Sequence, residues 1–160
     1  MSSLHLTVDA LPARFPPGIR VGFDLVQISR IAESVHQFGD RFERRLFTDH
    51  ELDYAHRSEG LCFERLAARF AAKEATIKAL AFGEQGIGWR EIEVCKLPDG
   101  SCHIALHGHA AVLASHMGIT QMALSLSHDG DYAGAIVTVL CHPPESLTLI
   151  TLFFLPTHHP

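Results

Sequence analysis

The sequence predicts an α+β fold, with helices packed on a small, mainly antiparallel sheet. Apolar residues recur at spacings of three and four mainly between residues 27 and 82, as in amphipathic helices. After residue 90, apolar and polar residues mostly alternate, and polar turns separate the alternating stretches, as in antiparallel strands. With 160 residues, of which 47% are hydrophobic and 19% charged, the chain has the size and composition of one globular domain.

The first half of the chain predicts one strand and three helices. Residues 19–26 are typical of a short buried strand, and residues 27–38 of an amphipathic helix. Thr48 and Glu51 have the spacing of a capping box, which predicts a second, short helix. The clearest helix covers residues 64–82, where alanines beside the apolar face would let a neighbouring element approach closely.

The second half predicts two pairs of strands with a helix between them. A polar turn joins the two strands of each pair. The predicted strands cover residues 90–97, 102–106, 122–127 and 132–140, and the helix covers residues 110–117.

Composition and charge exclude several classes of protein. The formal net charge of −5 argues against nucleic-acid binding as the main activity. The four cysteines show no C-x-x-C spacing, so we interpret them as reduced thiols of a cytoplasmic protein. The N-terminus does not read as a secretory signal, and the longest apolar run, at residues 147–155, is too short to span a membrane.

The twelve histidines are unusually many for a chain of this length. His103, His107, His109 and His116 lie close together in sequence, but not at the spacing of a zinc site. We therefore interpret the histidines as scattered over the surface and the helix ends.

We expect one domain at residues 19–141. A proline-containing, extended lead-in at residues 1–18 precedes it, and a tail at residues 142–160 follows it. The apolar part of the tail could add an edge strand, cover a neighbouring chain or remain unpacked, and the sequence does not decide between these roles.

Three charged residues each allow a structural and a functional interpretation. Asp24 lies in an apolar strand, where it must accept hydrogen bonds, end the strand or bind a cation. Glu74 and Lys78 are four residues apart on a helix, which is the spacing of an ordinary surface ion pair. In the functional interpretation, Asp24 and Glu74 bind a hard cation such as Mg²⁺ and Lys78 meets a phosphate.

Two further patterns concern the surface. Arg41, Arg44 and Arg45 share one face if their segment is helical, which makes either a solvated face or a docking surface for an acidic protein. The stretch Ser125-Leu126-Ser127-His128 suggests serine–histidine catalysis, but residues two or three apart on a strand rarely allow that geometry. We therefore expect a binding role beside the turn instead.

These motifs, taken in order, resemble the holo-acyl-carrier-protein synthases, a family of 4'-phosphopantetheinyl transferases. The string R-F-A-A-K-E-A at residues 69–75, with G-F-D-L at residues 22–25 upstream, is highly specific. The resemblance runs from about residue 19 to residue 140. Its other matching stretches are residues 28–31, 41–51, 89–94 and 125–133.

The resemblance implies a small α+β transferase fold, a homotrimer and coenzyme A bound between protomers. It implies Mg²⁺ held by Asp24 and Glu74 together with the pyrophosphate of coenzyme A, with Lys78 on a phosphate. An acidic residue often stands in the family where this chain has Gln27, so a third metal contact is left open.

The resemblance also assigns two sets of binding residues. The positions near the nucleotide end of coenzyme A are Arg69, Phe70, Ser127 and His128. The positions that face the carrier protein are Arg30, Arg41 and Arg45, and Arg44 extends this basic patch.

The implied activity is transfer of 4'-phosphopantetheine from coenzyme A to a serine of an apo acyl carrier protein. The products are the holo carrier and adenosine 3',5'-bisphosphate, and the expected context is fatty acid and lipid biosynthesis. The alternative is a non-catalytic module that binds the carrier or coenzyme A. The sequence identifies neither the carrier protein nor the general base.

Overall fold

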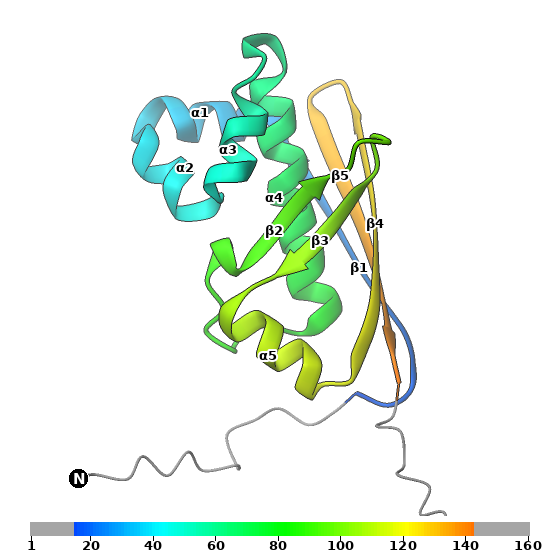
Figure 1. Cartoon of the computed structure of the whole chain (residues 1–160). Helices are drawn as coiled ribbons and strands as arrows, with labels where there is room; N and C mark the ends of the chain where they lie inside the picture. The colour runs from blue at the N-terminus through cyan, green and yellow to red at the C-terminus, as the bar shows by residue number, and fades with distance from the viewer. Residues whose placement is uncertain (1–14, 143–160) are drawn as a thin grey trace, which may run out of the picture.

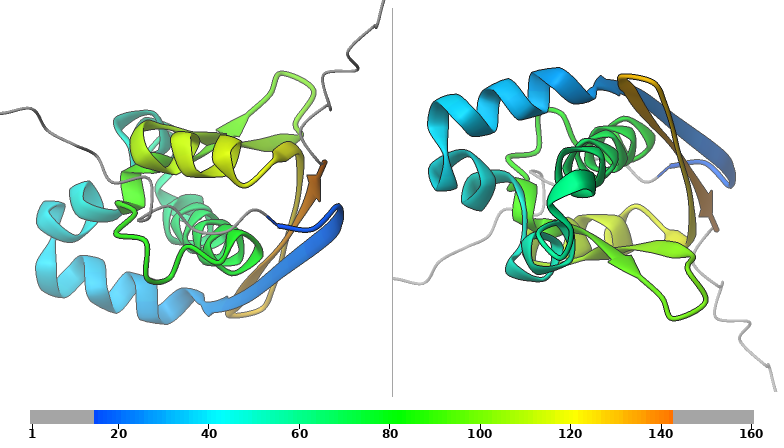
Figure 2. Two further views of the ribbon diagram at one scale, coloured as in Figure 1. Left: turned by 90° about the horizontal axis from the view of Figure 1, so that it is seen from below. Right: turned by 90° about the horizontal axis from the view of Figure 1, so that it is seen from above.

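The long helix α4, Cys62–Leu80, lies at the centre of the structure, a computed structural model that describes residues 15–142 (Figure 1). Figure 2 looks nearly along α4 and shows other elements on every side of it. A three-stranded sheet covers one side, helices α1 to α3 a second, and the pair β2–β3 with α5 a third. The α+β class is thus confirmed.

Among residues 15–142, no helix combines the length and apolarity needed to cross a bilayer.

The strands form two separate antiparallel sheets rather than one. The larger sheet has the order β1-β5-β4, formed by Gly18–Gln27, Tyr132–Cys141 and Ile119–Asp129. The smaller sheet pairs β2, Ile92–Lys96, with β3, Cys102–Leu106.

The segment before β2 is helical and not extended. Residues 89–91 form the short 3₁₀ helix η3, whereas the sequence predicted a strand from residue 90. The Glu91 carboxylate accepts hydrogen bonds from the backbone N–H groups of Gly88 and His109, which favours a turn here.

The first three helices follow β1 directly. They are α1, Ile28–Phe38; α2, Asp40–Leu46; and α3, Asp49–Ala55, followed by the 3₁₀ helix η2, Glu59–Leu61. The predicted capping box is present at α3, where Thr48 and Glu51 satisfy each other's backbone N–H groups. The last helix, α5, spans Gly108–His116, close to the prediction.

Helix α4 ends two residues earlier than the sequence predicted. Ala81 adopts a left-handed conformation with φ of 53°, and the N–H of Phe82 bonds the carbonyl of Ile77. This reversal turns Phe82 back into the core, where it is 2% exposed. Burial of an aromatic side chain offsets the cost of the left-handed alanine.

Strand β1 lies directly on α4 because Gly22 has no side chain. A Cβ atom at Gly22 would lie 1.9 Å from the carbonyl oxygen of Ala75 and 2.8 Å from the backbone nitrogen of Ala79. Both alanines are fully buried. The glycine and the two alanines thus fix the distance between strand and helix.

A buried ion pair joins α3 to α4. Lys73 Nζ lies 2.8 Å from Glu51 Oε2, and both side chains are completely buried. Lys73 also donates to the carbonyl oxygens of Trp89 and Ile92, and Glu51 Oε1 accepts from the N–H of Val94. The pair therefore also fixes β2 and is fully hydrogen-bonded, as buried charges require.

We predict that Gly22→Ala destabilises the fold by about 3 kcal/mol, because the clash is with helix backbone that cannot rotate away. Urea unfolding would measure the loss. The matched control is Gly83→Ala, where an added Cβ meets no atom within 4 Å. That variant should stay within about 0.5 kcal/mol of wild type. Equal losses in both variants would contradict the role assigned to Gly22.

Candidate active site

The strand–helix contact brings Asp24 and Lys78 together. Asp24 lies on the same face of β1 as Gly22, two residues further along. Lys78 Nζ lies 2.7 Å from Asp24 Oδ1 and also donates to the carbonyl oxygen of Phe23. The lysine side chain is 53% exposed and the aspartate side chain 16%, so the ammonium group lies at the mouth of this site.

Glu74 completes the group from one turn earlier on α4. Burial raises the pKa of its carboxyl group, the negative charge of Asp24 raises it further, and Lys78 acts in the opposite direction. Within residues 15–142, the carboxylate that pairs with Lys78 is that of Asp24, not that of Glu74. The i, i+4 spacing suggested a surface ion pair between Glu74 and Lys78. The structure instead has a cluster of three charged residues, Asp24, Glu74 and Lys78.

This cluster suits a hard divalent cation. Burial first and the charge of Asp24 second raise the pKa of Glu74, and a bound cation would relieve the repulsion between the two carboxylates. The side-chain amide nitrogen of Gln27 donates to Asp131 at 2.8 Å, and a third metal contact from Gln27 stays an open question. Asp131 also accepts two hydrogen bonds from Ser29 at the start of α1.

A second group of predicted residues lines a cavity of about 380 Å³ on the other side of α4. Arg69, Ser127 and His128 all contribute to its wall. Arg69 is only 3% exposed, and its Nε has no hydrogen-bond partner among the described residues. Burial lowers the pKa of this guanidinium group. Its Nη1 donates to the carbonyl oxygen of Arg65, and the guanidinium group lies 4.3 Å from the centroid of the Tyr54 ring. A buried cation with one free N–H at a cavity wall suits an anionic ligand.

Three residues of this cavity did not emerge from the sequence. Arg65 and Lys96 add positive charge, and both lie over the ring of Tyr54, at 4.6 and 5.3 Å from its centroid. A hydrogen bond from Lys96 lowers the pKa of the Tyr54 hydroxyl. Arg65 precedes Arg69 by one helical turn, and this spacing was the signal in the sequence that both arginines face the same cavity.

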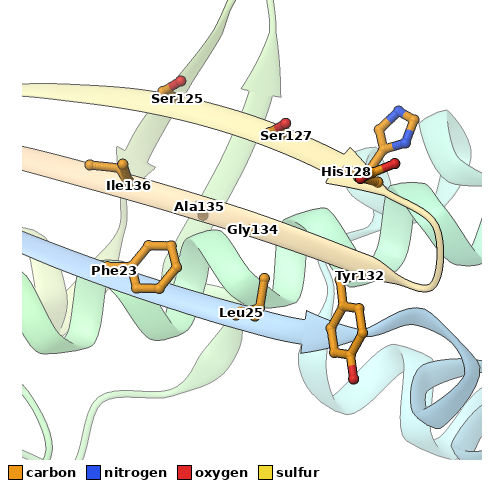
Figure 3. A pocket seen from close by; sticks show the side chains of 10 residues that line it. Phe23, Leu25, Ser125, Ser127, His128, Tyr132, Gly134, Ala135 and Ile136 are labelled. Atoms are coloured by element: carbon orange, nitrogen blue, oxygen red, sulfur yellow. The ribbon is translucent and has the colours of Figure 1, made fainter.

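A hollow of about 250 Å³ opens on the outer face of the larger sheet (Figure 3). Phe23 and Leu25 of β1 border it together with Ile136 of β5, and Ser127 and His128 lie along its β4 side. Gly134 lies between Leu25 and Ser127 in the cross-strand register, and its missing side chain makes room for the hollow. Ser127 and His128 therefore face both hollows.

The predicted site residues do not all meet within one chain. Asp24, Glu74 and Lys78 line neither of the two hollows. Phe70, predicted to lie near the nucleotide, stacks instead on Trp89, with ring centroids 5.2 Å apart. Its role in binding stays a prediction.

The predicted docking arginines are exposed. Arg41, Arg44 and Arg45 project from α2, and Glu43 of the same helix is buried. Arg30 is exposed on the first turn of α1. Arg44 also borders a pocket that several acidic residues line, namely Asp40, Glu43, Asp49 and Asp53.

Comparison with known proteins found similar sequences and a similar fold. The profile of the 4'-phosphopantetheinyl transferase superfamily matches residues 20–137. A holo-acyl-carrier-protein synthase of Gloeobacter violaceus is 42% identical over 121 residues, 76% of this chain and 92% of the relative. One from Koribacter versatilis is 44% identical over 117 residues, 72% and 93% of the two chains. The structure of a Chronobacterium ammoniagenes ACPS–CoA complex superposes with a TM-score of 0.71 and 36% identity, covering 79% of this chain and 99% of that one.

We predict that Glu74→Gln does not destabilise the metal-free protein at neutral pH. Because the pKa of Glu74 is raised in the folded state, its charged form opposes folding above that pKa. The penalty vanishes as pH falls below the ordinary value of 4.5. In buffer that contains a metal chelator, the melting temperature of the variant at pH 7 should therefore equal or exceed that of wild type. The difference between the two melting temperatures should shrink on acidification.

The melting temperature of both proteins across this pH range checks the prediction. The control is Glu33→Gln, which removes an exposed glutamate of α1 and should show no such trend. A Glu74→Gln protein that melts well below wild type at pH 7 would refute the repulsion.

Proposed function

This chain belongs to the 4'-phosphopantetheinyl transferase superfamily, and from that membership we propose that it is a magnesium-dependent holo-acyl-carrier-protein synthase. It transfers 4'-phosphopantetheine from coenzyme A to a serine of an apo acyl carrier protein and releases adenosine 3',5'-bisphosphate. The observation that carries the proposal is the cluster of Asp24, Glu74 and Lys78 at the β1–α4 contact.

Each member of the cluster has its own task. Asp24 and Glu74 would hold Mg²⁺, which neutralises the pyrophosphate of coenzyme A and orients it. Lys78 is half-exposed on a flexible side chain, so it can leave Asp24 and bind a phosphate oxygen. Its positive charge stabilises the negative charge that develops on the leaving phosphate.

The cavity beside α4 supplies the binding site for the nucleotide end of coenzyme A. Arg65, Arg69 and Lys96 line it together with the carboxylate of Glu64, and the excess of positive charge suits the phosphorylated ribose. Ser127 and His128 lie on its β4 side and offer a hydroxyl group and an imidazole as hydrogen-bonding partners.

We further propose that three copies assemble through the outer face of the larger sheet. Ile19, Val21, Phe23 and Leu25 of β1 are 55–73% exposed there, and Ile136 of β5 continues the patch. A contiguous apolar face of this kind marks a protein interface. A second copy seated on it would cover the outer face of the strand that carries Asp24, which is compatible with coenzyme A binding between protomers.

A cytoplasmic location and a carrier of fatty acid or lipid biosynthesis complete the proposal. All four cysteines are free thiols, as suits a reducing compartment.

Transfer itself is tested by intact-mass measurement of an apo carrier incubated with coenzyme A, Mg²⁺ and the protein. We expect a gain of one phosphopantetheine group, and loss of that gain when Mg²⁺ is chelated. Glu74→Gln should reduce turnover on the order of 100-fold, because an amide is a poor ligand for a hard cation. Glu33→Gln should keep full turnover. If no candidate carrier gains mass, the non-catalytic binding module becomes the better interpretation.

Assembly is tested by light scattering at micromolar concentration, where we expect three times the chain mass of 17.6 kDa. Phe23→Glu places a charge in the apolar face and should yield smaller species with reduced activity. The control is Val112→Glu on α5, which is equally exposed but lies away from the sheet. A monomeric wild type with full activity would show that the site is complete in one chain.

Carrier docking is tested with the double variant Arg44→Glu, Arg45→Glu. Charge reversal on α2 should raise the KM for the carrier far more than the KM for coenzyme A, because carrier proteins of this kind are expected to be acidic. Added salt should reproduce part of the effect, since exposed charges are screened. Equal changes in both KM values would rule out a docking surface on α2.

A further inference from the structure

A group of metal-binding side chains lies outside the proposed transferase site. His50 comes from α3, and Glu93 and Cys95 come from β2. Their donor atoms all lie within 4.8 Å of one another, with His50 Nδ1 only 3.2 Å from Glu93 Oε1. Nothing in the proposed transfer reaction requires an imidazole and a thiol at this place.

Rigid elements hold all three side chains. Glu93 and Cys95 are two residues apart on one strand, so they project from the same face, and the ladder to β3 fixes their backbone. His50 lies in the first turn of α3, which the Thr48–Glu51 capping box anchors. The hydroxyl of Thr48 also donates to Glu93 Oε1, which ties the start of α3 to the strand.

His107 orients the carboxylate of Glu93 from the other side. Its Nε2 lies 2.6 Å from Glu93 Oε2, which leaves Oε1 turned toward His50. In many metal sites, a hydrogen bond from a neighbouring residue orients the carboxylate, so that the other oxygen faces the metal. Burial tends to raise the pKa of Glu93, but the hydrogen bonds from His107 and Thr48 outweigh it and lower the pKa. The carboxylate is therefore charged at neutral pH.

We propose that His50, Glu93 and Cys95 bind a zinc ion, with water in the fourth position. One imidazole, one carboxylate and one thiolate form a ligand set that zinc accepts. A tetrahedral zinc ion with bonds of about 2.0–2.3 Å keeps its donor atoms about 3.3–3.8 Å apart. His50 Nδ1 and Glu93 Oε1 already have this spacing, and all three donor atoms lie within 4.8 Å of one another, so side-chain rotations would have to bring Cys95 Sγ to bonding distance.

The two carboxylates near Cys95 favour a cation at this place, and the positive charge of Arg69 opposes it. Burial and the carboxylates of Glu93 and Glu51 raise the pKa of the Cys95 thiol. The metal-free protein therefore keeps this thiol protonated, and zinc must displace the proton. The same carboxylates attract the cation. The bound ion would join α3 to β2 on the outer side of the buried Lys73–Glu51 pair.

Cobalt is the appropriate probe, because a cobalt–thiolate bond gives a charge-transfer absorption in the near ultraviolet. Titration of untagged protein with Co²⁺ should develop this band to saturation at one ion per chain, and Zn²⁺ should abolish it. Zn²⁺ should also raise the melting temperature, since it binds only the folded site. The tail histidines, His158 and His159, would not give a thiolate band.

Variants locate the site. Cys95→Ser should lose the band, whereas Cys102→Ser, on the opposite face of the β2–β3 pair, should retain it. His50→Gln should weaken cobalt binding strongly, and His107→Gln about 10–100-fold, as expected for a positioning residue. His116→Gln on α5 should change nothing.

The proposal stands apart from the transferase assignment. Glu74→Gln should keep the thiolate band although it loses turnover, so failure of either proposal is recognised separately. The zinc site is refuted if no band appears, or if the band survives in Cys95→Ser. In that outcome the cluster is a hydrogen-bonded surface network in which Glu93 joins α3 to β2 without a metal.

Discussion

The close contact of β1 with α4 is the constraint on which the site depends. Only a glycine at position 22 lets the strand backbone reach Ala75 and Ala79, and the next inward-facing residue of the strand is Asp24. A strand held further away would leave Lys78 without its 2.7 Å contact and Glu74 without its charged neighbour. The close packing of Gly22 on two alanines thus determines the distances between the charged groups of the site.

The string R-F-A-A-K-E-A combines structural and functional residues because successive helix positions face different directions. Lys73 is fully buried against Glu51, whereas Glu74 beside it is half-buried next to Asp24. Removing one partner of such a buried pair typically costs about 3–5 kcal/mol, so Lys73 serves the fold that positions Glu74. The family resemblance assigned Glu74 and Lys78 to the site, but nothing in the sequence predicted the buried pair of Lys73, because the two lysines are equally polar.

Local signals in the sequence predicted most elements of the fold. The capping box at Thr48 and the alanine-rich helix depend on neighbours within a few residues, and both are present. Of the features that depend on distant contacts, the sequence suggested the grouping of Asp24 with Glu74 and Lys78 through the family resemblance, and others escaped prediction. The Arg69 cavity recruits Lys96 from β2, and the histidines interpreted as scattered include His107, which meets Glu93 of that same strand. Ligand spacing along the chain says nothing about contacts between a helix and a hairpin.

In strand β1, the structure differs from the sequence-based prediction in which side chains are buried. Its apolar residues predicted a buried strand, yet Ile19, Val21 and Phe23 face outward and are more than half exposed. The inward face is the more polar one, with Arg20, Gly22 and Asp24 against α4. A strand that is apolar on its exposed face is unfavourable in an isolated chain. If a second copy covers that face, the prediction of a buried strand is correct for the assembly, and the hollow beside Gly134 becomes part of an interface rather than open surface.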